Sequence, residues 1–173
     1  PRSSSAASDV YKRQGHATPW HQDGQYWPIR PLATCTVWLA IDDANVENGC
    51  LRFIKGSHKE KKLKSHNIND NKNLTLNQEL DESEYNEKDA VNLILKRGQI
   101  SLHDVYLVHG SEANNSSMAR RAVTMRFMPT SSVFDHQMVK DKNLFSKLNA
   151  SKYQDRKIYH MRGEDISGKN NLT

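Results

Sequence analysis

This 173-residue chain has only two cysteines and no long apolar run, and both features limit the classes of protein to which it can belong. Cys35 and Cys50 cannot make a disulfide framework of the kind found in small secreted domains, so we expect a reducing, cytoplasmic setting. No stretch approaches the ~20 consecutive apolar residues that a membrane-spanning helix needs. Apolar residues make up 36% of the chain and charged residues 26%, which predicts one polar, globular domain without a membrane partner.

The positive charges lack the neighbours that nucleic-acid binding requires. The net charge is +5, and much of it lies in residues 55–64, where no aromatic residue separates the lysines. Nucleic-acid binding needs a basic face joined to stacking side chains or a recognised module. We therefore expect a solvated loop and no nucleic-acid partner, while an anionic substrate such as an acyl-CoA stays open.

The first fourteen residues differ in composition from the rest. They are rich in Ser and Ala, as disordered linkers are, and contain neither an initiator Met nor the apolar segment of a signal peptide. We interpret residues 1–14 as a non-native or disordered leader and residues 15–173 as the domain. A native flexible terminus is the alternative.

The segment Trp20-His21-Gln22-Asp23 carries the main chemical signal. On an extended segment alternate side chains point the same way, so His21 and Asp23 can bind one metal ion while Gln22 turns away. His109, directly before Gly110-Ser111, is the best candidate for a third ligand. Two His and one carboxylate form the facial triad of non-haem Fe(II) oxygenases. By itself a His-x-Asp pair is a weak signal, and a solvated turn is the alternative.

Two arginines are candidates to bind an acidic co-substrate beside this triad. Arg120 lies eleven residues after His109 at the start of an apolar run, where a guanidinium can hold a carboxylate through two parallel N–H bonds. Alternation along this run puts Arg126 on the same face, so Arg126 is the alternative anchor. Of the other histidines, we expect His58 to be exposed, and His103 either to contact the site or to be a satisfied buried imidazole.

Further motifs follow the His-Gln-Asp segment along the chain. They are Thr36-Val37-Trp38-Leu39-Ala40, Glu47-Asn48-Gly49-Cys50-Leu51, Lys55-Gly56-Ser57-His58, and His109-Gly110-Ser111 with Arg120. In order and spacing these motifs resemble the phytanoyl-CoA dioxygenase family. The resemblance covers residues 15 to about 168 and corresponds to the later part of a family member, so we expect a jelly roll that is incomplete at its N-terminus.

The resemblance implies an Fe(II)- and 2-oxoglutarate-dependent dioxygenase on a mostly β, double-stranded β-helix (jelly-roll, cupin-like) core. It implies that His21, Asp23 and His109 bind Fe(II), and that Ser111 and Arg120 bind the far carboxylate of 2-oxoglutarate. The expected reaction uses O2 to hydroxylate a small organic or acyl substrate, with succinate and CO2 as co-products. Halogenation is disfavoured because the carboxylate ligand is retained.

Alternating and β-branched residues predict strands over 34–41, 50–54, 90–95, 100–103, 106–109 and 120–128. In the first strand we assign Thr34, Thr36, Trp38 and Ala40 to the cavity and Cys35, Val37, Leu39 and Ile41 to the outer face. Trp38 then either covers the co-substrate or is a plain core aromatic. Asn48-Gly49 predicts a hairpin turn. We expect Gln25, Tyr26, Trp27 and Arg30 near the pocket mouth.

Two long segments lack a strong pattern. Residues 59–88 predict a polar loop or lid with a short helix near 76–85, and residues 130–173 a C-terminal extension with a short helix over 143–148. The competing function is a non-catalytic, cupin-like metal- or sugar-binding module. We expect weak or no turnover from this chain alone.

Overall fold

The computed structural model describes residues 15–140 and 156–173, so the leader and the helix expected over 143–148 lie outside the described residues. The described part is mostly β. Its strands are β1 (Thr18–His21), β2 (Ile29–Arg30), β3 (Cys35–Ala40), β4 (Leu51–Ile54), β5 (His66–Ile68), β6 (Gln78–Leu80), β7 (Ala90–Asn92), β8 (Ile100–Asp104), β9 (His109–Ser111), β10 (Ala122–Phe127) and β11 (Val133–Phe134). The short helical elements are η1 (Asp23–Gln25), η2 (Glu82–Glu84), η3 (Glu87–Asp89) and α1 (His136–Lys140).

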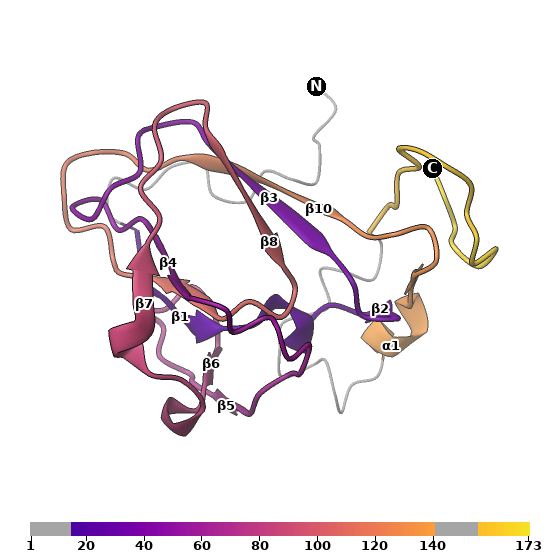
Figure 1. Ribbon diagram of the computed structural model, residues 1–173, viewed down its shortest axis with the longest axis horizontal. Coiled ribbons are helices and arrows are strands. Elements are labelled where there is room, and N and C mark those ends of the chain that lie inside the picture. The colour runs from indigo at the N-terminus through magenta and orange to yellow at the C-terminus, as the bar shows by residue number, and fades with distance from the viewer. Residues whose placement is uncertain (1–14, 141–155) are drawn as a thin grey trace.

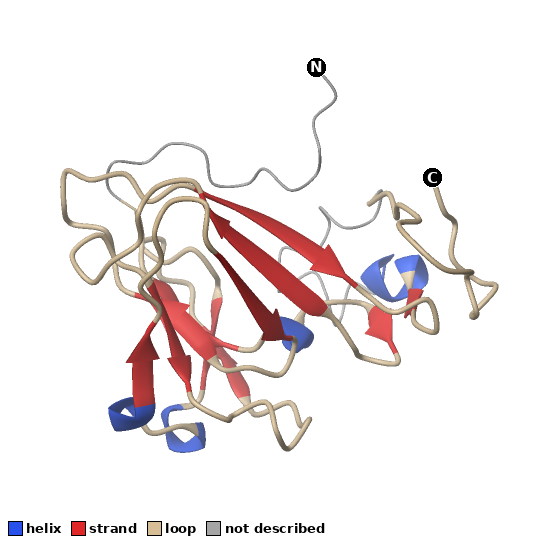
Figure 2. Ribbon diagram, turned by 45° about the horizontal axis from the view of Figure 1, so that its top comes forward, coloured by secondary structure: helices blue, strands red, loops and turns tan. Residues whose placement is uncertain are grey.

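Two antiparallel sheets form the main body of the fold. One has four strands in the order β1-β9-β4-β7, and the other has three in the order β10-β3-β8. The chain passes from one sheet to the other between β3 and β4, between β7 and β8, and at each step from β8 to β10 (Figure 1). Figure 2 shows the three-stranded sheet lying across the four-stranded one. This alternation between two sheets is the jelly-roll arrangement, and the predicted fold class is confirmed.

The alternation in β3 separates an inner from an outer face. Thr36, Trp38 and Ala40 are buried, whereas Cys35 is exposed. Trp38 and Ala40 pack with Cys50, Leu51 and Leu95 in one apolar cluster. The predicted assignment of the Thr/Trp face to the interior is therefore correct, and it places this face opposite the strands that carry the histidines.

Asn48 and Gly49 form a turn that connects the two sheets. The hairpin prediction is wrong, because β3 and β4 belong to different sheets. Gly49 has a φ of +72°, and a Cβ there would lie 2.6 Å from the carbonyl oxygen of Glu112, so only glycine fits. Asn48 is buried, and its Nδ2 donates to the carbonyl oxygens of Asp43 and Ala119. The turn thereby fixes the peptide that precedes Arg120.

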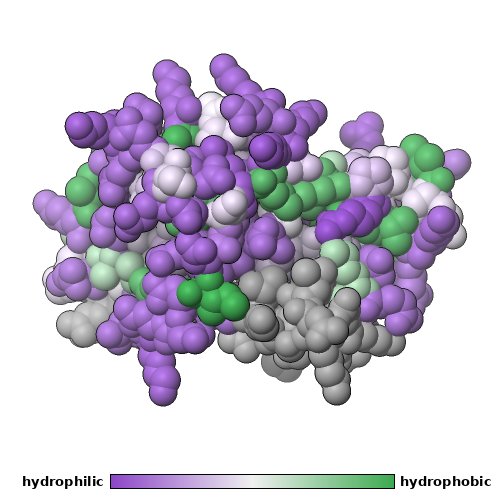
Figure 3. Space-filling model, turned by 90° about the horizontal axis from the view of Figure 1, so that it is seen from below, coloured by the Kyte–Doolittle hydropathy of each residue, from purple (hydrophilic) through white to green (hydrophobic). Residues whose placement is uncertain are grey.

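The polar segment 59–88 contains a two-stranded sheet, β5 with β6, and the turns η2 and η3. The helix expected near residues 76–85 is wrong. The side chains of Asp81 and Asn86 accept hydrogen bonds from backbone N–H groups two residues further on, which favours turns over a helix. On the face that Figure 3 shows, most of the described residues are hydrophilic.

Several strand boundaries also differ from the prediction. β7 ends at Asn92, β9 begins only at His109, and β10 begins at Ala122, so Arg120 precedes its strand. Tyr26 and Trp27, expected at a pocket mouth, are 9% and 3% exposed and pack with Ile29 and Phe134. Within the described residues, no helix has the length and apolar character needed to cross a membrane.

Candidate metal centre

The neighbouring residues His21 and Asp23 meet His109, which is distant in the sequence, between the sheets. One potential ligand atom from each of His21, Asp23 and His109 lies within 4.8 Å of the others. The three residues are 3%, 1% and 6% exposed, and the two imidazole centres are 4.2 Å apart. Among the described residues, this is the one such group of His, Cys, Asp and Glu.

The pairing of β1 with β9 brings the two histidines together. Thr18 pairs with Ser111 and His21 with His109, so β1 carries one more residue than β9 between these pairs. Such a bulge re-aims side chains. Gly110 lies where the two backbones come closest, since a Cβ there would be 2.9 Å from the carbonyl oxygen of Thr18. A glycine between His109 and Ser111 therefore permits the close approach of β1.

Each triad histidine is held by the carbonyl oxygen two residues before it. Nδ1 of His21 lies 2.9 Å from the oxygen of Pro19, and Nδ1 of His109 lies 2.9 Å from the oxygen of Leu107. A carbonyl oxygen only accepts, so Nδ1 carries a proton in each ring, and in the neutral imidazole Nε2 is then the nitrogen with the lone pair. A backbone bond of this kind is what fixes the tautomer and orientation of metal-binding histidines.

Gln22 points away from the triad and connects the polar segment 59–88 to the end of β1. β1 ends at His21 and Asp23 opens η1, but Gln22 between them is extended, with φ −118° and ψ 131°. Gln22 is fully buried; its Nε2 donates to the carbonyl oxygens of Lys62 and Tyr106, and its Oε1 accepts from the N–H of Lys64. The alternation expected for His-Gln-Asp therefore holds beyond the end of the strand.

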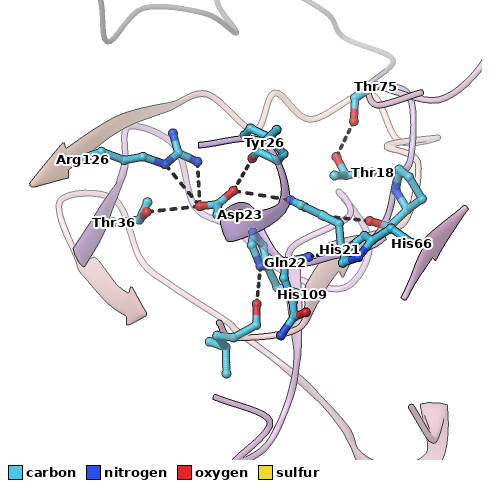
Figure 4. A network of polar contacts seen from close by, with 12 residues as sticks. Thr18, His21, Gln22, Asp23, Tyr26, Thr36, His66, Thr75, His109 and Arg126 are labelled. Carbon is cyan, nitrogen blue, oxygen red and sulfur yellow. Dashed lines mark hydrogen bonds and ion pairs between the residues drawn. The ribbon is translucent and has the colours of Figure 1, made fainter. Parts of the chain in front are cut away.

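The Asp23 carboxylate has partners on both oxygens (Figure 4). Oδ2 accepts from the Thr36 hydroxyl at 3.2 Å and from Nη2 of Arg126 at 2.7 Å. Oδ1 accepts from the Tyr26 hydroxyl and lies 3.7 Å from Nε2 of His21. Burial alone would raise the pKa of Asp23, but Arg126 and then the histidines outweigh it and hold this pKa well below its usual value. The carboxylate is therefore ionised at neutral pH.

His103 adjoins the triad without belonging to it. Its ring centre is 5.0 Å from that of His109 and 5.5 Å from that of Phe53. Burial lowers the pKa of His103 to about 4, and burial also lowers the pKa of His109 well below its usual value, so both rings are neutral at pH 7. Nδ1 of His103 is buried with no hydrogen-bond partner among the described residues.

The residues expected to bind 2-oxoglutarate are linked to one another through Leu51 and Cys50. Ser111 pairs with Leu51, and Leu51 packs with Trp38 and Cys50. Burial raises the pKa of the Cys50 thiol, and the nearby Arg120 guanidinium partly opposes this rise. Oγ of Ser111 is buried and meets no hydrogen-bond partner in the described part of the chain.

The other histidines lie outside the triad. His58 is half-buried rather than exposed, and the prediction of a solvated ring is wrong. His136 is also half-buried, against Phe134, while His160 is exposed.

Sequence reasoning missed the roles of Tyr26, Thr36 and His66. Strand alternation pointed Thr36 inward, but nothing in the sequence aims it at Asp23. For the contact between Tyr26 and Asp23, the available signal was their three-residue spacing within a turn. His66 accepts a hydrogen bond from the backbone N–H of Gln22 at 3.1 Å, across a separation that no local pattern predicts.

Comparison with known proteins places the chain in a family. The model of the family described as Phytanoyl-CoA dioxygenase (PhyH) matches residues 5–122. The Phytanoyl-CoA dioxygenase domain-containing protein 1 homolog of Dictyostelium discoideum is 35% identical over 123 residues, which cover 69% of this chain and 44% of the relative. Human peroxisomal phytanoyl-CoA dioxygenase is 33% identical over 116 residues, covering 63% of this chain and 32% of the relative. The chain thus spans less than half the length of these relatives.

Solved structures resemble the same part of the fold. EvdO2 from Micromonospora carbonacea var. aurantiaca, complexed with 2-oxoglutarate, is 31% identical with a TM-score of 0.57, over 67% of this chain and 46% of that one. The epimerase SnoN, complexed with Fe3+, alpha ketoglutarate and nogalamycin RO, is 22% identical with a TM-score of 0.54, over 73% and 47%, a likeness of fold alone.

Fold and site together define a jelly-roll protein with a buried His/Asp/His group, whose histidines lie on two paired strands and whose aspartate lies in the turn after the first strand. The matched residues make up more than half of the sequence. The chain belongs to the phytanoyl-CoA dioxygenase family.

Proposed function

We propose that this chain forms the catalytic core of a non-haem Fe(II) dioxygenase, which uses 2-oxoglutarate and O2 to hydroxylate a small organic or acyl substrate. Succinate and CO2 are the co-products. In this proposal the three buried triad residues bind Fe(II), Ser111 and Arg120 bind the far carboxylate of 2-oxoglutarate, and Trp38 covers the co-substrate. The observation that carries it is the buried convergence of His21, Asp23 and His109.

The chemistry of the three donors fits Fe(II). The two imidazoles present Nε2 as a lone-pair donor because their Nδ1–H groups donate hydrogen bonds to carbonyl oxygens. The third donor is an ionised carboxylate, whose pKa Arg126 and the histidines keep low against the effect of burial. Two neutral nitrogens and one carboxylate oxygen form the facial set that leaves further positions open.

The residues around the triad have separate tasks in this proposal. When bound, Fe(II) supplies the redox chemistry that activates O2. Arg120 and Ser111 bind one end of the diacid and orient its other end toward the triad, which turns a chance encounter into a fixed geometry. Trp38 and Leu51, packed together in the interior, exclude water from the reacting atoms.

The membership of the family and the likeness to EvdO2, solved with 2-oxoglutarate, support the choice of co-substrate. The substrate itself is proposed only as a class, because the matched segment is less than half of each relative.

Conversion of 2-oxoglutarate to succinate tests the proposal. Turnover by wild-type protein with Fe(II), 2-oxoglutarate and O2 is expected to be weak, but succinate should still form above the level of Asp23→Ala, which lacks the carboxylate donor and should lose iron binding. Arg121→Gln is the matched control, because Arg121 pairs with Asp42 at the surface. Equal succinate formation by wild type and Asp23→Ala would contradict the assignment. Metal uptake with no 2-oxoglutarate binding would favour the cupin-like binding module instead.

A further inference from the structure

Arg126 occupies a different place from Arg120. Arg126 lies on β10, and its Nη2 and Nε are 2.7 Å and 3.2 Å from Oδ2 of Asp23. Its guanidinium also stacks on Trp27, with Cζ 4.5 Å from the ring centre. These contacts commit the Arg126 side chain to the turn that carries the metal-binding carboxylate (Figure 4).

We propose that Arg126, with Thr36, is a positioning residue that holds Asp23 so that it binds the metal through Oδ1 alone. The proposal rests on the metal site proposed above, and it leaves the co-substrate carboxylate to Arg120. Arg126, the alternative anchor from strand alternation, then contacts neither metal nor co-substrate and acts only through Asp23.

The two oxygens of Asp23 have unequal surroundings. Oδ2 accepts three N–H or O–H groups, two from Arg126 and one from Thr36, so its two lone-pair directions are taken by the protein. Oδ1 accepts from the Tyr26 hydroxyl and faces Nε2 of His21 at 3.7 Å. One lone pair of Oδ1 thus remains on the side of the histidines. Ligation through both oxygens would require Arg126 to leave.

Strand pairing fixes this arrangement. Arg126 pairs with Thr36 across β10 and β3, and Thr36 pairs with His103 across β3 and β8. The six residue pairs between β10 and β3 hold Arg126 and Thr36 at one level of the sheet, directly against Asp23. A planar guanidinium makes two N–H contacts in a fixed geometry, which the single ammonium group of a lysine does not reproduce.

Calorimetric titration with Co(II), a redox-stable substitute for Fe(II), followed by titration of the Co(II)-loaded protein with 2-oxoglutarate, separates the two arginines without turnover. Arg126→Gln is expected to lower Co(II) affinity by about tenfold to a hundredfold and to leave 2-oxoglutarate affinity unchanged. Arg126→Lys should restore part of the Co(II) affinity. Arg120→Lys should do the reverse, weakening 2-oxoglutarate binding with Co(II) affinity unchanged. Arg121→Gln, which removes an arginine from a surface ion pair, should change neither.

A second pair of variants keeps the test decisive if Arg126→Gln does not fold. Thr36→Val removes one hydrogen bond to Oδ2 and should weaken Co(II) binding, while Thr36→Ser should restore it. Unchanged Co(II) affinity in Arg126→Lys and Thr36→Val would overturn the inference, as would weaker 2-oxoglutarate binding in Arg126→Gln. Wild-type protein that binds Co(II) but not 2-oxoglutarate would refute the proposed function alone and leave the Arg126 claim to be decided by Co(II) affinity.

Discussion

His66 lies outside the triad but supports the end of β1, the strand that carries His21. Its Nδ1 lies 2.9 Å from the carbonyl oxygen of Lys64, and its Nε2 accepts the backbone N–H of Gln22 at 3.1 Å. An imidazole that donates at one nitrogen and accepts at the other is neutral. Burial lowers the pKa of His66 accordingly. The link between the polar segment and the residue next to His21 therefore depends on a neutral ring.

Acid should weaken this link before it affects the rest of the fold. The pKa of His66 is lower in the folded chain than its ordinary value of 6.5, so the unfolded chain binds more protons as the pH falls. The stabilisation by His66 is complete above pH ~6.5 and is lost as the pH falls toward its folded pKa. His66→Gln offers an acceptor that does not titrate. Urea unfolding of the metal-free protein should show wild type losing more stability than His66→Gln between pH 8 and pH 5.5. An equal loss in the two proteins would contradict this account.

At the scale of elements, the outer face of the three-stranded sheet is apolar. Val123, Leu39 and Ile100 form one cross-strand row, and Met125, Val37 and Leu102 form the next. Ile100 is 52% exposed and Leu102 is 62% exposed. Contiguous exposed apolar surface favours association. We therefore expect this face, rather than the metal site, to cause self-association of the chain in solution.

Replacing the two most exposed residues of β8 tests that expectation. The double variant Ile100→Thr with Leu102→Thr has β-branched side chains that suit a strand at both positions but removes much of the apolar surface. Light scattering should show less self-association than in wild type, with Co(II) affinity unchanged. Val91→Thr is the matched control, since Val91 is 53% exposed on β7 of the other sheet and should alter neither. Equal scattering by all three proteins would show that the β8 face does not drive association.

The elements also show which parts of the molecule the sequence predicts. The period of two in β3 correctly predicts its inner face, because one buried face imposes strict alternation. The alternating pattern wrongly predicted that the strand begins at Arg120, which precedes β10. The helix predicted over 76–85 is absent because asparagine and aspartate side chains there favour turns. Local spacing brings His21 next to Asp23, but the Arg126–Asp23 contact spans 103 residues. Only the sheet register determines that contact.

At the scale of the whole molecule, the site depends on both sheets at once. β1 and β9 carry the histidines, η1 carries Asp23, and β3 and β10 supply Thr36 and Arg126 from the opposite sheet. Loss of packing between the sheets would therefore separate the carboxylate from its partners even with every ligand present. We therefore expect metal binding to depend on the packing of both sheets and not only on three side chains.

Anaerobic titration with Fe(II) and then 2-oxoglutarate is the most direct measurement of the central claim. The protein should bind about one equivalent of Fe(II), as expected for a single facial site, and 2-oxoglutarate should then produce the charge-transfer absorption of its iron chelate. His109→Ala and Asp23→Ala should abolish that absorption, and Arg120→Lys should shift it to higher 2-oxoglutarate concentration. An absorption of equal strength in wild type and both alanine variants would contradict the account.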